Sequence, residues 1–432
     1  MTLEKNGYRP RIIDKRIAEY LKLFGAVSIE GPKWCGKTWT SLKHANSVVY
    51  IMDPAGNYSN REKAKINPSL ILDGKAPLAI DEWQEVPGIW DAVRFDVDQT
   101  STVGKYILTG SVTPPRKSYT HSGAGRFAFV RMRPMTLFES GDSYGMISFE
   151  SLFRDNCIDA FSIDTDLVTL IDITVRGGWP ETIRLPMEKT GLVSEAYINA
   201  IIKNELLRED FSKRNTAKLT KLLRALARSN AAPVSNTTLS LDMDGNTRQE
   251  QNASEISVSR TTVAEYLNDL KRLFIIEEIP GWNPGIRSKT RIRMAPKRIF
   301  SDPSLAIATL GLNRERLLSD LNTYGFMFEN LCLRDIAVYA ENCGGAVCHY
   351  RDNAGLEADA IVEMPDGTWG AFEIKLGEHQ VDAAALSLLR LKEKMTLNGA
   401  PPPVCLVVIT GGGFGRQRKD GVCVVPITAL QP

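Results

Sequence analysis

The sequence predicts an α/β protein in which a parallel sheet comes first and smaller domains follow. Three observations support this prediction: a glycine-rich loop pattern between an apolar run and a helix-compatible run, further short apolar runs at intervals, and two late strands carrying acidic residues and a lysine. Apolar runs separated by segments long enough for crossovers are typical of parallel sheets with helices on both faces. The 432 residues are enough for about two to four domains.

Composition narrows the class of protein. The formal net charge of +2 is too balanced to indicate a nucleic-acid partner by itself, so any basic surface must be local. The seven cysteines are odd in number and scattered, which favours a reducing compartment over a disulfide framework. Cys343, Cys348 and His349 have no second pair of ligands near them, so we expect packing residues rather than a zinc site. Because no apolar run approaches membrane-spanning length and no apolar signal region occurs near Met1, we expect a cytoplasmic protein without a membrane partner.

The glycine-rich loop, residues 31–38, matches the P-loop pattern G-x-x-x-x-G-K-[ST] at every fixed position. Its glycines let the backbone turn so that N–H groups and the start of the next helix surround phosphate groups. We therefore expect ATP and Mg²⁺ here, with Lys37 on the β and γ phosphates and Thr38 supplying a hydroxyl to Mg²⁺. The predicted nucleotide-contacting residues are Gly31, Pro32, Lys33, Trp34, Cys35, Gly36, Lys37, Thr38 and Trp39. The alternative is a glycine turn that binds nothing.

Two acidic residues follow the short apolar run at residues 77–80. A buried strand there would deliver Asp81 and Glu82 to its carboxyl end. Asp81 would hold Mg²⁺ through water, and Glu82 would be the catalytic residue that polarises the water attacking the γ-phosphate. An ordinary strand end is the alternative, but the position after a P-loop favours hydrolysis over binding alone.

The other elements of the first domain follow in order. Residues 11–21 have apolar residues at helical spacing and predict an amphipathic helix against the sheet. Strands are predicted at residues 26–30, 48–52, 78–81, 106–109 and 127–130. Thr109 and Ser111 emerge at the end of one strand, where either could contact the γ-phosphate and sense its presence. A plain strand-to-turn exit is the alternative.

Arg126 lies in a glycine-rich loop, residues 122–126. An arginine on such a loop could be a catalytic residue that neutralises charge on the transferred phosphoryl group, in its own subunit or in a neighbour's. A solvated loop arginine is the alternative, and the sequence does not separate the two.

Residues 11–139 resemble the AAA-like P-loop ATPases of bacteria and archaea that carry a characteristic C-terminal domain of unknown function. The matching stretches are residues 31–38, 80–87, 107–111 and 124–126. The resemblance implies Mg²⁺-dependent ATP hydrolysis on an AAA-type core, and it is compatible with a homo-oligomer because such modules often form rings. Trp34 and Cys35 are bulkier than the family's loop, and Trp83 replaces a usual aliphatic residue. These departures remove no phosphate-contacting group and put only the nucleotide preference in doubt.

The middle of the chain predicts two smaller parts. Residues 140–215 predict a helical connector that transmits the nucleotide state, with a glycine-rich turn at residues 177–180 and a helix at 196–211. Residues 216–290 resemble a winged helix. Its predicted elements are a basic amphipathic helix at 218–228, a loop at 231–252, two short helices joined near 257–259, and a strand at 273–279.

The second of these short helices carries the predicted contact surface. Val263, Leu267 and Leu270 fall on one face and are expected to pack inward, which leaves residues 260–262 to meet a partner. DNA and protein partners are both left open. Residues 287–298 form a strongly basic stretch that could neutralise DNA phosphates or form a solvated linker.

Four charged residues near the C-terminal end form a second candidate centre. Glu329 lies in an apolar helix predicted at residues 326–340, Asp359 lies on one strand, and Glu373 and Lys375 share a face of the next strand. Carboxylates at such positions can bind Mg²⁺, and a neighbouring lysine can orient or deprotonate water. The pattern resembles the PD-(D/E)xK, or restriction-endonuclease-like, nuclease core, although Ala358 replaces the usual proline. The resemblance implies Glu329, Asp359 and Glu373 as metal ligands and Asp359, Glu373 and Lys375 as catalytic residues. A hairpin with ordinary polar faces is the alternative.

The predicted organisation is a P-loop NTPase parallel-sheet domain at residues 1–139, a helical connector at 140–215, a winged-helix-like domain at 216–290 and an α/β restriction-endonuclease-like domain at 291–432. The predicted function is a Mg²⁺-dependent ATPase that couples nucleotide state to DNA binding or processing. The alternative is an NTPase switch whose C-terminal domains bind only protein partners.

Overall fold

The structure is a computed structural model that describes residues 3–113, 122–155, 158–205, 215–244, 258–285 and 294–432. The chain forms two compact units, one from Met1–Met135 with Leu270–Ile275 and the other from Thr136–Asp269 with Ile276–Pro432. The first boundary lies close to the one predicted after residue 139. The residues of the three later predicted domains lie almost entirely in the second unit.

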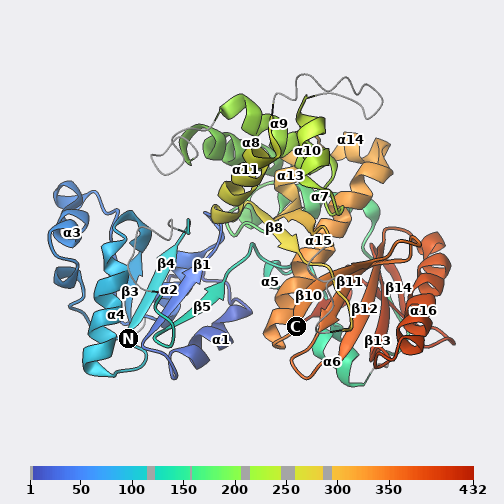
Figure 1. Cartoon of the computed structure of the whole chain (residues 1–432), viewed down its shortest axis with the longest axis horizontal. Coiled ribbons are helices and arrows are strands. Elements are labelled where there is room, and N and C mark those ends of the chain that lie inside the picture. The colour runs from blue at the N-terminus through green and yellow to red at the C-terminus, as the bar shows by residue number, and fades with distance from the viewer. Residues whose placement is uncertain (1–2, 114–121, 156–157, 206–214, 245–257, 286–293) are drawn as a thin grey trace. The chain divides into compact units, whose positions relative to one another are not determined.

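Within the described residues, the first unit is built on a five-stranded parallel sheet in the order β2-β3-β4-β1-β5 (Figure 1). Its strands are β1 (Ala26–Glu30), β2 (Ser47–Tyr50), β3 (Leu78–Asp81), β4 (Tyr106–Gly110) and β5 (Phe127–Arg131). Its helices are α1 (Ile13–Tyr20), α2 (Lys37–His44), α3 (Ala55–Ile66) and α4 (Gly88–Thr100). The predicted parallel sheet is confirmed, and because its strands run in one direction, their carboxyl ends meet at one edge.

Both faces of the central strands are buried, as expected for a sheet with helices on each side. Ile80 and Leu108 pack with Trp90 of α4 in one apolar cluster. Val27 and Ile107, which point to the opposite face, are also fully buried. Each such aliphatic side chain stabilises the fold by about 1.5–3 kcal/mol relative to exposure. This burial holds the carboxyl edge of the sheet in place.

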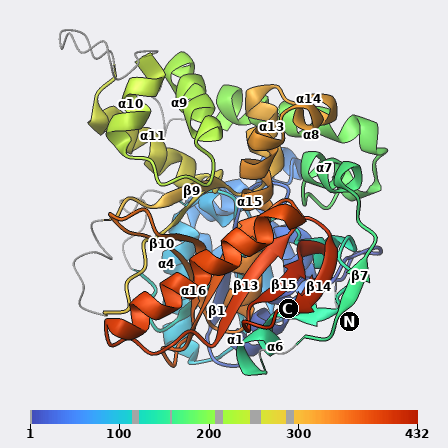
Figure 2. The same ribbon diagram turned by 90° about the vertical axis from the view of Figure 1, so that its right-hand side faces the viewer.

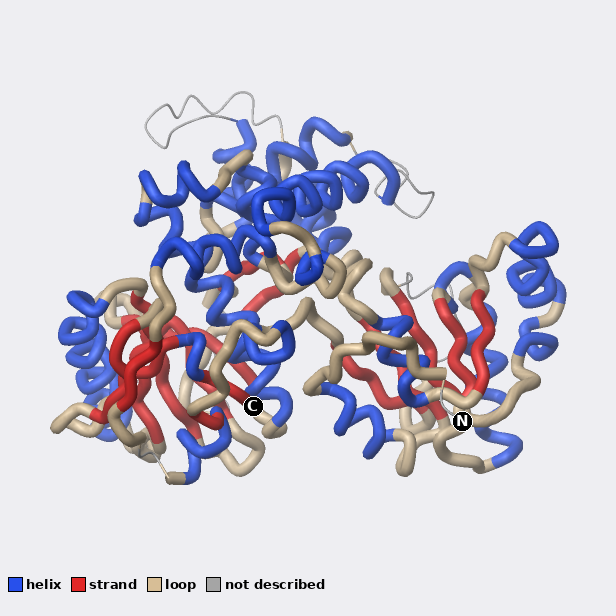
Figure 3. Tube along the Cα trace, turned by 180° about the vertical axis from the view of Figure 1, so that it is seen from behind, coloured by secondary structure: helices blue, strands red, loops and turns tan. Residues whose placement is uncertain are grey.

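Between β7 (Phe161–Ile163) and β10 (Ala346–Arg351), the described part of the second unit is mostly helical, as Figure 3 shows. Its helices there are α7 (Leu167–Arg176), α8 (Met187–Ala200), α9 (Thr216–Arg228), α10 (Asn236–Asp244), α11 (Arg260–Arg272), α13 (Pro303–Leu310), α14 (Arg314–Ser319) and α15 (Leu321–Asn342). The last residues of α11 group with the first unit. In the portion of the chain that the structure describes, no helix is both long and apolar enough to span a membrane.

Two sequence predictions need correction in this helical region. Helix α10 lies inside the predicted loop at 231–252, because Leu239 and Met243, one helical turn apart, are buried although most of their neighbours are polar. Helix α8 begins nine residues before the predicted helix at 196–211. The first of the two short helices predicted near 257–259 lies outside the described residues.

Strands β8 (Ile276–Ile279) and β9 (Lys297–Phe300) form an antiparallel ribbon. Lys297 and Arg298 belong to the predicted basic stretch, of which residues 287–293 lie outside the described residues. Both side chains are buried, and Arg298 donates hydrogen bonds to Glu278 at 3.0 Å and to the carbonyl of Val234 at 2.7 Å. The prediction that this stretch is a solvated linker or a phosphate-binding surface is therefore wrong for these two residues.

The C-terminal part of the second unit contains a sheet in the order β10-β11-β12-β13-β15-β14-β7 among the described strands. Its further strands are β11 (Glu357–Glu363), β12 (Trp369–Lys375), β13 (Cys405–Thr410), β14 (Gly413–Gln417) and β15 (Cys423–Pro426). Helix α16 (Val381–Leu397) lies across one face of this sheet (Figure 2). There Leu388 packs with Ala371 and Val408. On the other face Phe149 of α6 (Phe149–Arg154) stacks on Phe372 at 5.7 Å between ring centroids, and α15 contacts β10, β11 and β12.

Three short elements complete the second unit. They are α5 (Leu137–Ser140), β6 (Ile147–Ser148) and β16 (Leu430–Gln431). Strands β6 and β16 pair in parallel, and a buried carboxylate of Asp335 on α15 accepts a hydrogen bond from the N–H of Leu137 at 2.8 Å. The start of the second unit is thereby tied to the C-terminal strand β16 and to α15.

Candidate functional site

The loop at residues 31–38 connects β1 to α2 at the carboxyl edge of the first sheet. A Cβ at Gly31 would lie 2.1 Å from the carbonyl oxygen of Met132, so only glycine fits where these two backbones approach. Gly36 has a φ of 103° and precedes the first residue of α2 without any side chain to cap it. The N–H groups of the first helical turn therefore face the loop, which is the arrangement that binds anions.

Lys37 and Thr38 begin helix α2 and point toward the loop and the neighbouring strand. The buried ammonium group of Lys37 donates to the carbonyl oxygens of Gly31 at 2.9 Å and Pro32 at 2.7 Å. Thr38 donates its hydroxyl to Asp81 at the end of β3, with 2.8 Å between the oxygens. The structure thus brings the P-loop lysine, the P-loop hydroxyl and the first acidic residue to one place.

Asp81 is held by two hydroxyl groups. Its Oδ1 accepts hydrogen bonds from Thr38 and, at 2.6 Å, from Thr109 of β4. Burial raises the pKa of Asp81, and the hydroxyl hydrogen bonds oppose that rise. One hydroxyl and one carboxylate oxygen at this edge are hard oxygen donors, which fit Mg²⁺.

Glu82 follows Asp81 in a left-handed backbone conformation, with a φ of 59°. Its carboxylate accepts a hydrogen bond from Ser111 at 2.9 Å and another from Gln84. A non-glycine residue with positive φ stores about 1–3 kcal/mol of strain and occurs mainly at functional sites. The hydrogen bond places Ser111, which was predicted to contact the γ-phosphate, beside Glu82, the candidate catalytic base.

Arg11 is a site residue that the sequence did not indicate. Its guanidinium group is 6% exposed and donates to the carbonyl of Cys35 at 2.7 Å and to that of Arg133 at 2.8 Å. Cys35 belongs to the P-loop, and residue 133 follows β5, so Arg11 joins the loop to the backbone beside it. Its position before an amphipathic helix carries no signal for this role, because the two acceptors lie 24 and 122 residues away.

The remaining loop residues differ in exposure. Trp34 is 54% exposed with a φ of 69°, whereas Cys35 is buried and donates its thiol to the carbonyl of Met132 at 3.7 Å. Lys33 and Trp39 are half-buried. Contacts of these side chains with a nucleotide stay predictions.

Arg126 lies at the opposite edge of the sheet. Its carbonyl accepts a hydrogen bond from the N–H of Ala26, the first residue of β1, while the P-loop follows the last residue of that strand. At 3.3 Å per residue, the strand separates the two ends by about 13 Å. The guanidinium of Arg126 is exposed and paired with Asp98 at 2.6 Å. This placement argues against a role in its own subunit's site, and a role in a neighbour's site stays a prediction.

A second charged cluster lies in the second unit. The carboxylates of Glu329 on α15, Asp359 on β11 and Glu373 on β12 are brought together, as the sequence predicted. Lys375 donates to Glu373 at 2.6 Å and to Asp359 at 3.1 Å. Lys297 on β9, which the sequence did not indicate, donates to Glu329 at 2.7 Å and to Asp359 at 3.4 Å.

Burial and mutual charge set the protonation of this cluster. Burial raises the pKa of Glu329 to about 7 and that of Glu373 to about 8, and the charge of Asp359 adds to both shifts. Burial opposes ionisation of Asp359 as well, but the charges of Lys297 and Lys375 lower its pKa overall. Asp359 is therefore the carboxylate that the two ammonium groups stabilise most.

The metal-ligand prediction for this cluster does not match its geometry. Among the described residues, no group of three or more acidic, histidine or cysteine side chains is arranged to hold a metal ion. An ammonium group lies between Glu329 and Asp359, and another lies between Asp359 and Glu373. Lysines thus provide the positive charge that Glu329, Asp359 and Glu373 were expected to receive from Mg²⁺.

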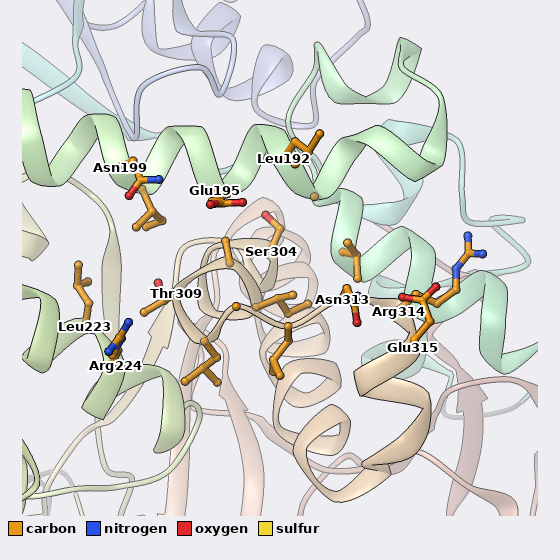
Figure 4. Close-up of a pocket in the computed structure, with 18 of the residues that line it drawn as sticks. Leu192, Glu195, Asn199, Leu223, Arg224, Ser304, Thr309, Asn313, Arg314 and Glu315 are labelled. Atoms are coloured by element: carbon orange, nitrogen blue, oxygen red, sulfur yellow. The ribbon is translucent and has the colours of Figure 1, made fainter. Parts of the chain in front are cut away.

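The helical part of the second unit also contains a pocket of about 720 Å³ that the sequence did not indicate. Glu195 and Asn199 of α8, Arg224 of α9 and Thr309 of α13 line it (Figure 4). Arg314, also at the pocket, pairs with both carboxylate oxygens of Asp172. The lining mixes charged and apolar side chains, which does not identify a ligand.

The geometry of the first unit defines a P-loop domain, and comparison with known families agrees. Residues 24–140 match the family described as "AAA domain". Residues 168–316 and 324–430 match two families described as domains of unknown function, DUF8612 and DUF4143. The AAA domain match contains the P-loop and the five strands of the first sheet, and the two later matches lie almost entirely in the second unit.

The chain is also similar to individual proteins. An uncharacterized protein of Mycobacterium tuberculosis and one of Mycobacterium bovis are each 23% identical over 364 residues, covering 83% of this chain and 72% of the relative. The Walker-type ATPase of Pyrococcus abyssi is 13% identical, with a TM-score of 0.42 over 71% of this chain and 97% of that chain. DnaA from Aquifex aeolicus is 15% identical, with a TM-score of 0.28 over 62% of this chain and 89% of that chain. Both structural likenesses are weak.

Proposed function

We propose that the protein is a Mg²⁺-dependent ATPase whose nucleotide state controls how its second unit engages DNA. One observation carries the enzymatic part. Lys37, Thr38, Asp81 and Glu82 meet at the carboxyl edge of one parallel sheet, inside the region that matches the AAA domain.

Each of these residues has a distinct role in the proposed reaction. Lys37 would exchange the loop carbonyls for phosphate oxygens, and the N–H groups at the start of α2 would bind the same phosphates. Thr38 and Asp81 would hold Mg²⁺, which when bound offsets the negative charge of the phosphates. Glu82 would leave its hydrogen bond with Ser111, orient the attacking water and accept its proton.

The DNA part of the proposal rests on the segment from α9 to β9. Three helices followed by an antiparallel ribbon fit a winged-helix-like module, and Pro233 adds a bridge to Lys297 at the ribbon's edge. Val263 and Leu267 of α11 are buried, while Arg260 at the start of the same helix is exposed. An exposed helix start with a cation fits contact with a phosphate backbone.

A second candidate function is an NTPase switch whose second unit binds only protein partners. The observation that favours it is the burial of Lys297 and Arg298, because these cations of the basic stretch are paired inside the protein. The two functions differ in whether DNA changes the rate of ATP hydrolysis.

The first test compares ATP hydrolysis by the wild type, Lys37→Ala and Lys43→Ala, each with and without DNA. Lys43 is a matched control, because it lies on the same helix but pairs with Glu4 at the surface. We expect Lys37→Ala to lose about 100-fold or more of the rate and Lys43→Ala to keep it. Full activity of folded Lys37→Ala would overturn the site.

DNA engagement is tested by binding of fluorescent duplex and single-stranded DNA at several salt concentrations. We expect Arg260→Ala to weaken binding several-fold and to reduce the salt dependence by about one phosphate contact. Arg390→Ala on the exposed side of α16 is the control. Absence of DNA binding, with hydrolysis unaffected by DNA, would favour the protein-partner switch.

A further inference from the structure

We propose that the ammonium group of Lys297 occupies the position that a divalent cation would take between Glu329 and Asp359, so that this cluster is a metal-free ionic group rather than a cleavage centre. The inference concerns the second unit alone and does not depend on ATP hydrolysis. It assigns to Lys297 a place in the candidate nuclease centre that the D…E-x-K pattern does not contain.

The distances support this assignment. Lys297 Nζ lies 2.7 Å from Glu329 Oε1, 3.4 Å from Asp359 Oδ1 and 3.3 Å from the carbonyl oxygen of Asp359. A divalent cation bridging the two carboxylates would lie about 2.0–2.6 Å from their oxygens. The ammonium group and such a cation would therefore overlap, and only one of them fits.

The side chain of Lys297 is also more buried than that of Lys375, and its backbone is held by a strand pair. Its side chain is 9% exposed, compared with 29% for Lys375. Its backbone belongs to β9, which pairs with β8 and is bridged by Pro233. Moving the ammonium group to solvent would require a path out of this packing and would leave two buried carboxylates facing each other, which is costly.

Asp359 has little capacity left for a metal. Its Oδ1 faces Lys297, and its Oδ2 accepts hydrogen bonds from the N–H of Ile374 at 2.8 Å and from Lys375 at 3.1 Å. A metal on this carboxylate would have to displace at least one ion pair. Both oxygens are already used within the protein.

The formal charges point the same way. Asp359 already has two ammonium groups within 3.4 Å of its oxygens. Both of them would repel a divalent cation placed between Glu329 and Asp359. Lys297 therefore removes the electrostatic reason for a metal to bind.

The consequence concerns what the second unit does with nucleic acid. A centre of this kind needs a metal to activate water and to stabilise charge on the phosphate. With Lys297 in place, we infer that the second unit binds a partner without cutting it. In the proposed function, ATP would then control engagement rather than cleavage.

The test measures Mn²⁺ binding by the nucleotide-free full chain, using electron paramagnetic resonance of free Mn²⁺. The variants are Asp359→Asn, Lys297→Met, the double variant of both, and Lys375→Met as the matched lysine control. We expect wild type and Asp359→Asn to bind Mn²⁺ equally. We expect Lys297→Met to gain one site at least tenfold tighter, which the double variant loses, and Lys375→Met to gain none because Lys297 remains.

Two results would overturn the proposal. One is a Mn²⁺ site in the wild type that Asp359→Asn removes. The other is a folded Lys297→Met protein, judged by circular dichroism and cooperative thermal unfolding, that binds Mn²⁺ no better than the wild type. If Lys297→Met does not fold, the comparison of wild type with Asp359→Asn decides alone, and equal binding supports the proposal. Because ATP is absent throughout, failure here is separate from failure of the proposed ATPase.

Discussion

The P-loop site of the first unit and the charged cluster of the second unit both combine lysine and carboxylate side chains, yet they are built for different tasks. Lys37 donates only to carbonyl oxygens of its own loop among the contacts of the described residues, and phosphate oxygens can replace these neutral acceptors. Lys297 and Lys375 instead lie between buried carboxyl groups. A lysine on neutral acceptors is available to a ligand, whereas a lysine between buried carboxylates serves the protein itself.

The carboxylates differ in the same way. Asp81 and Glu82 accept hydrogen bonds from hydroxyl groups of Thr38, Thr109 and Ser111, which can rotate away or share a metal. Asp359 accepts from two ammonium groups and a backbone N–H, whose positions are fixed by two strands, β9 and β12. The presence of acidic residues and a lysine therefore does not define a catalytic site. What those groups already bind decides whether they can bind anything else.

The largest expected effect is a loss of ATP hydrolysis when Glu82 at the P-loop site is changed. Glu82→Gln should lower the rate of ATP hydrolysis by about 10²–10³-fold while leaving nucleotide binding intact, because the amide keeps the hydrogen bond with Ser111 but cannot accept a proton. Glu85→Gln, three residues along the same turn, is the control. Hydrolysis and binding are measured separately, by phosphate release and by a fluorescent ATP analogue. A rate within a few-fold of the wild type would remove Glu82 from the mechanism.

The next largest effect is on the pH dependence of stability. It tests whether Lys297 keeps its positive charge beside His349. Burial and the positive charge of Lys297 together lower the pKa of His349 from 6.5 to about 4. The folded state therefore binds fewer protons than the unfolded state between these values. The contribution of His349 to the free energy of unfolding is fully present above pH 6.5. It falls by roughly 2–3 kcal/mol as the pH is lowered to 4.

Urea unfolding from pH 4 to pH 7 measures this loss. We expect His349→Gln to flatten the pH dependence in this window, because glutamine does not titrate. The control is His379→Gln, which alters an exposed histidine in a short helical turn. An unchanged slope in His349→Gln would contradict a buried neutral histidine beside a fixed cation.

The sequence predicts the first unit well because its signals are local. Each strand is a short apolar run, and the P-loop pattern is confined to residues 31–38. The same holds for Glu373 and Lys375, whose spacing of two places them on one face of a strand. The sequence did not predict the role of Lys297. Its partners, Glu329 and Asp359, lie 32 and 62 residues away and meet it only through the packing of β9 with α15 and β11. Its neighbours in sequence are basic, which suggested a solvated surface.

Helix α10 shows a second kind of failure. Its residues are mostly polar, so the pattern predicted a loop, and only the burial of Leu239 and Met243 against the rest of the second unit makes it a helix. Tertiary packing outweighs weak local preference in such a segment. The winged-helix-like prediction was made without this helix, and it stays a prediction.

A smaller effect concerns how the P-loop is held. Arg11→Lys should raise the KM for ATP roughly tenfold with little change in kcat, because lysine lacks the planar fork through which two separate nitrogens of Arg11 donate to Cys35 and Arg133, and the loop loses part of its support. Arg16→Lys on α1 is the matched control. Equal changes in both variants would indicate a general effect on the helix. A fall in kcat without a change in KM would contradict a positioning role.

The smallest expected effect is at Arg126. Because this arginine pairs with Asp98 at the edge of the sheet opposite the P-loop, Arg126→Ala should leave hydrolysis within about twofold of the wild type. Asp98→Ala, which removes the partner and keeps the arginine, is the control and should behave alike. An arginine that stabilises the transferred phosphoryl group contributes about 10³-fold or more. A loss of that size in Arg126→Ala alone, growing with protein concentration, would show that Arg126 acts in the site of a neighbouring subunit, because the strand between them separates it from its own.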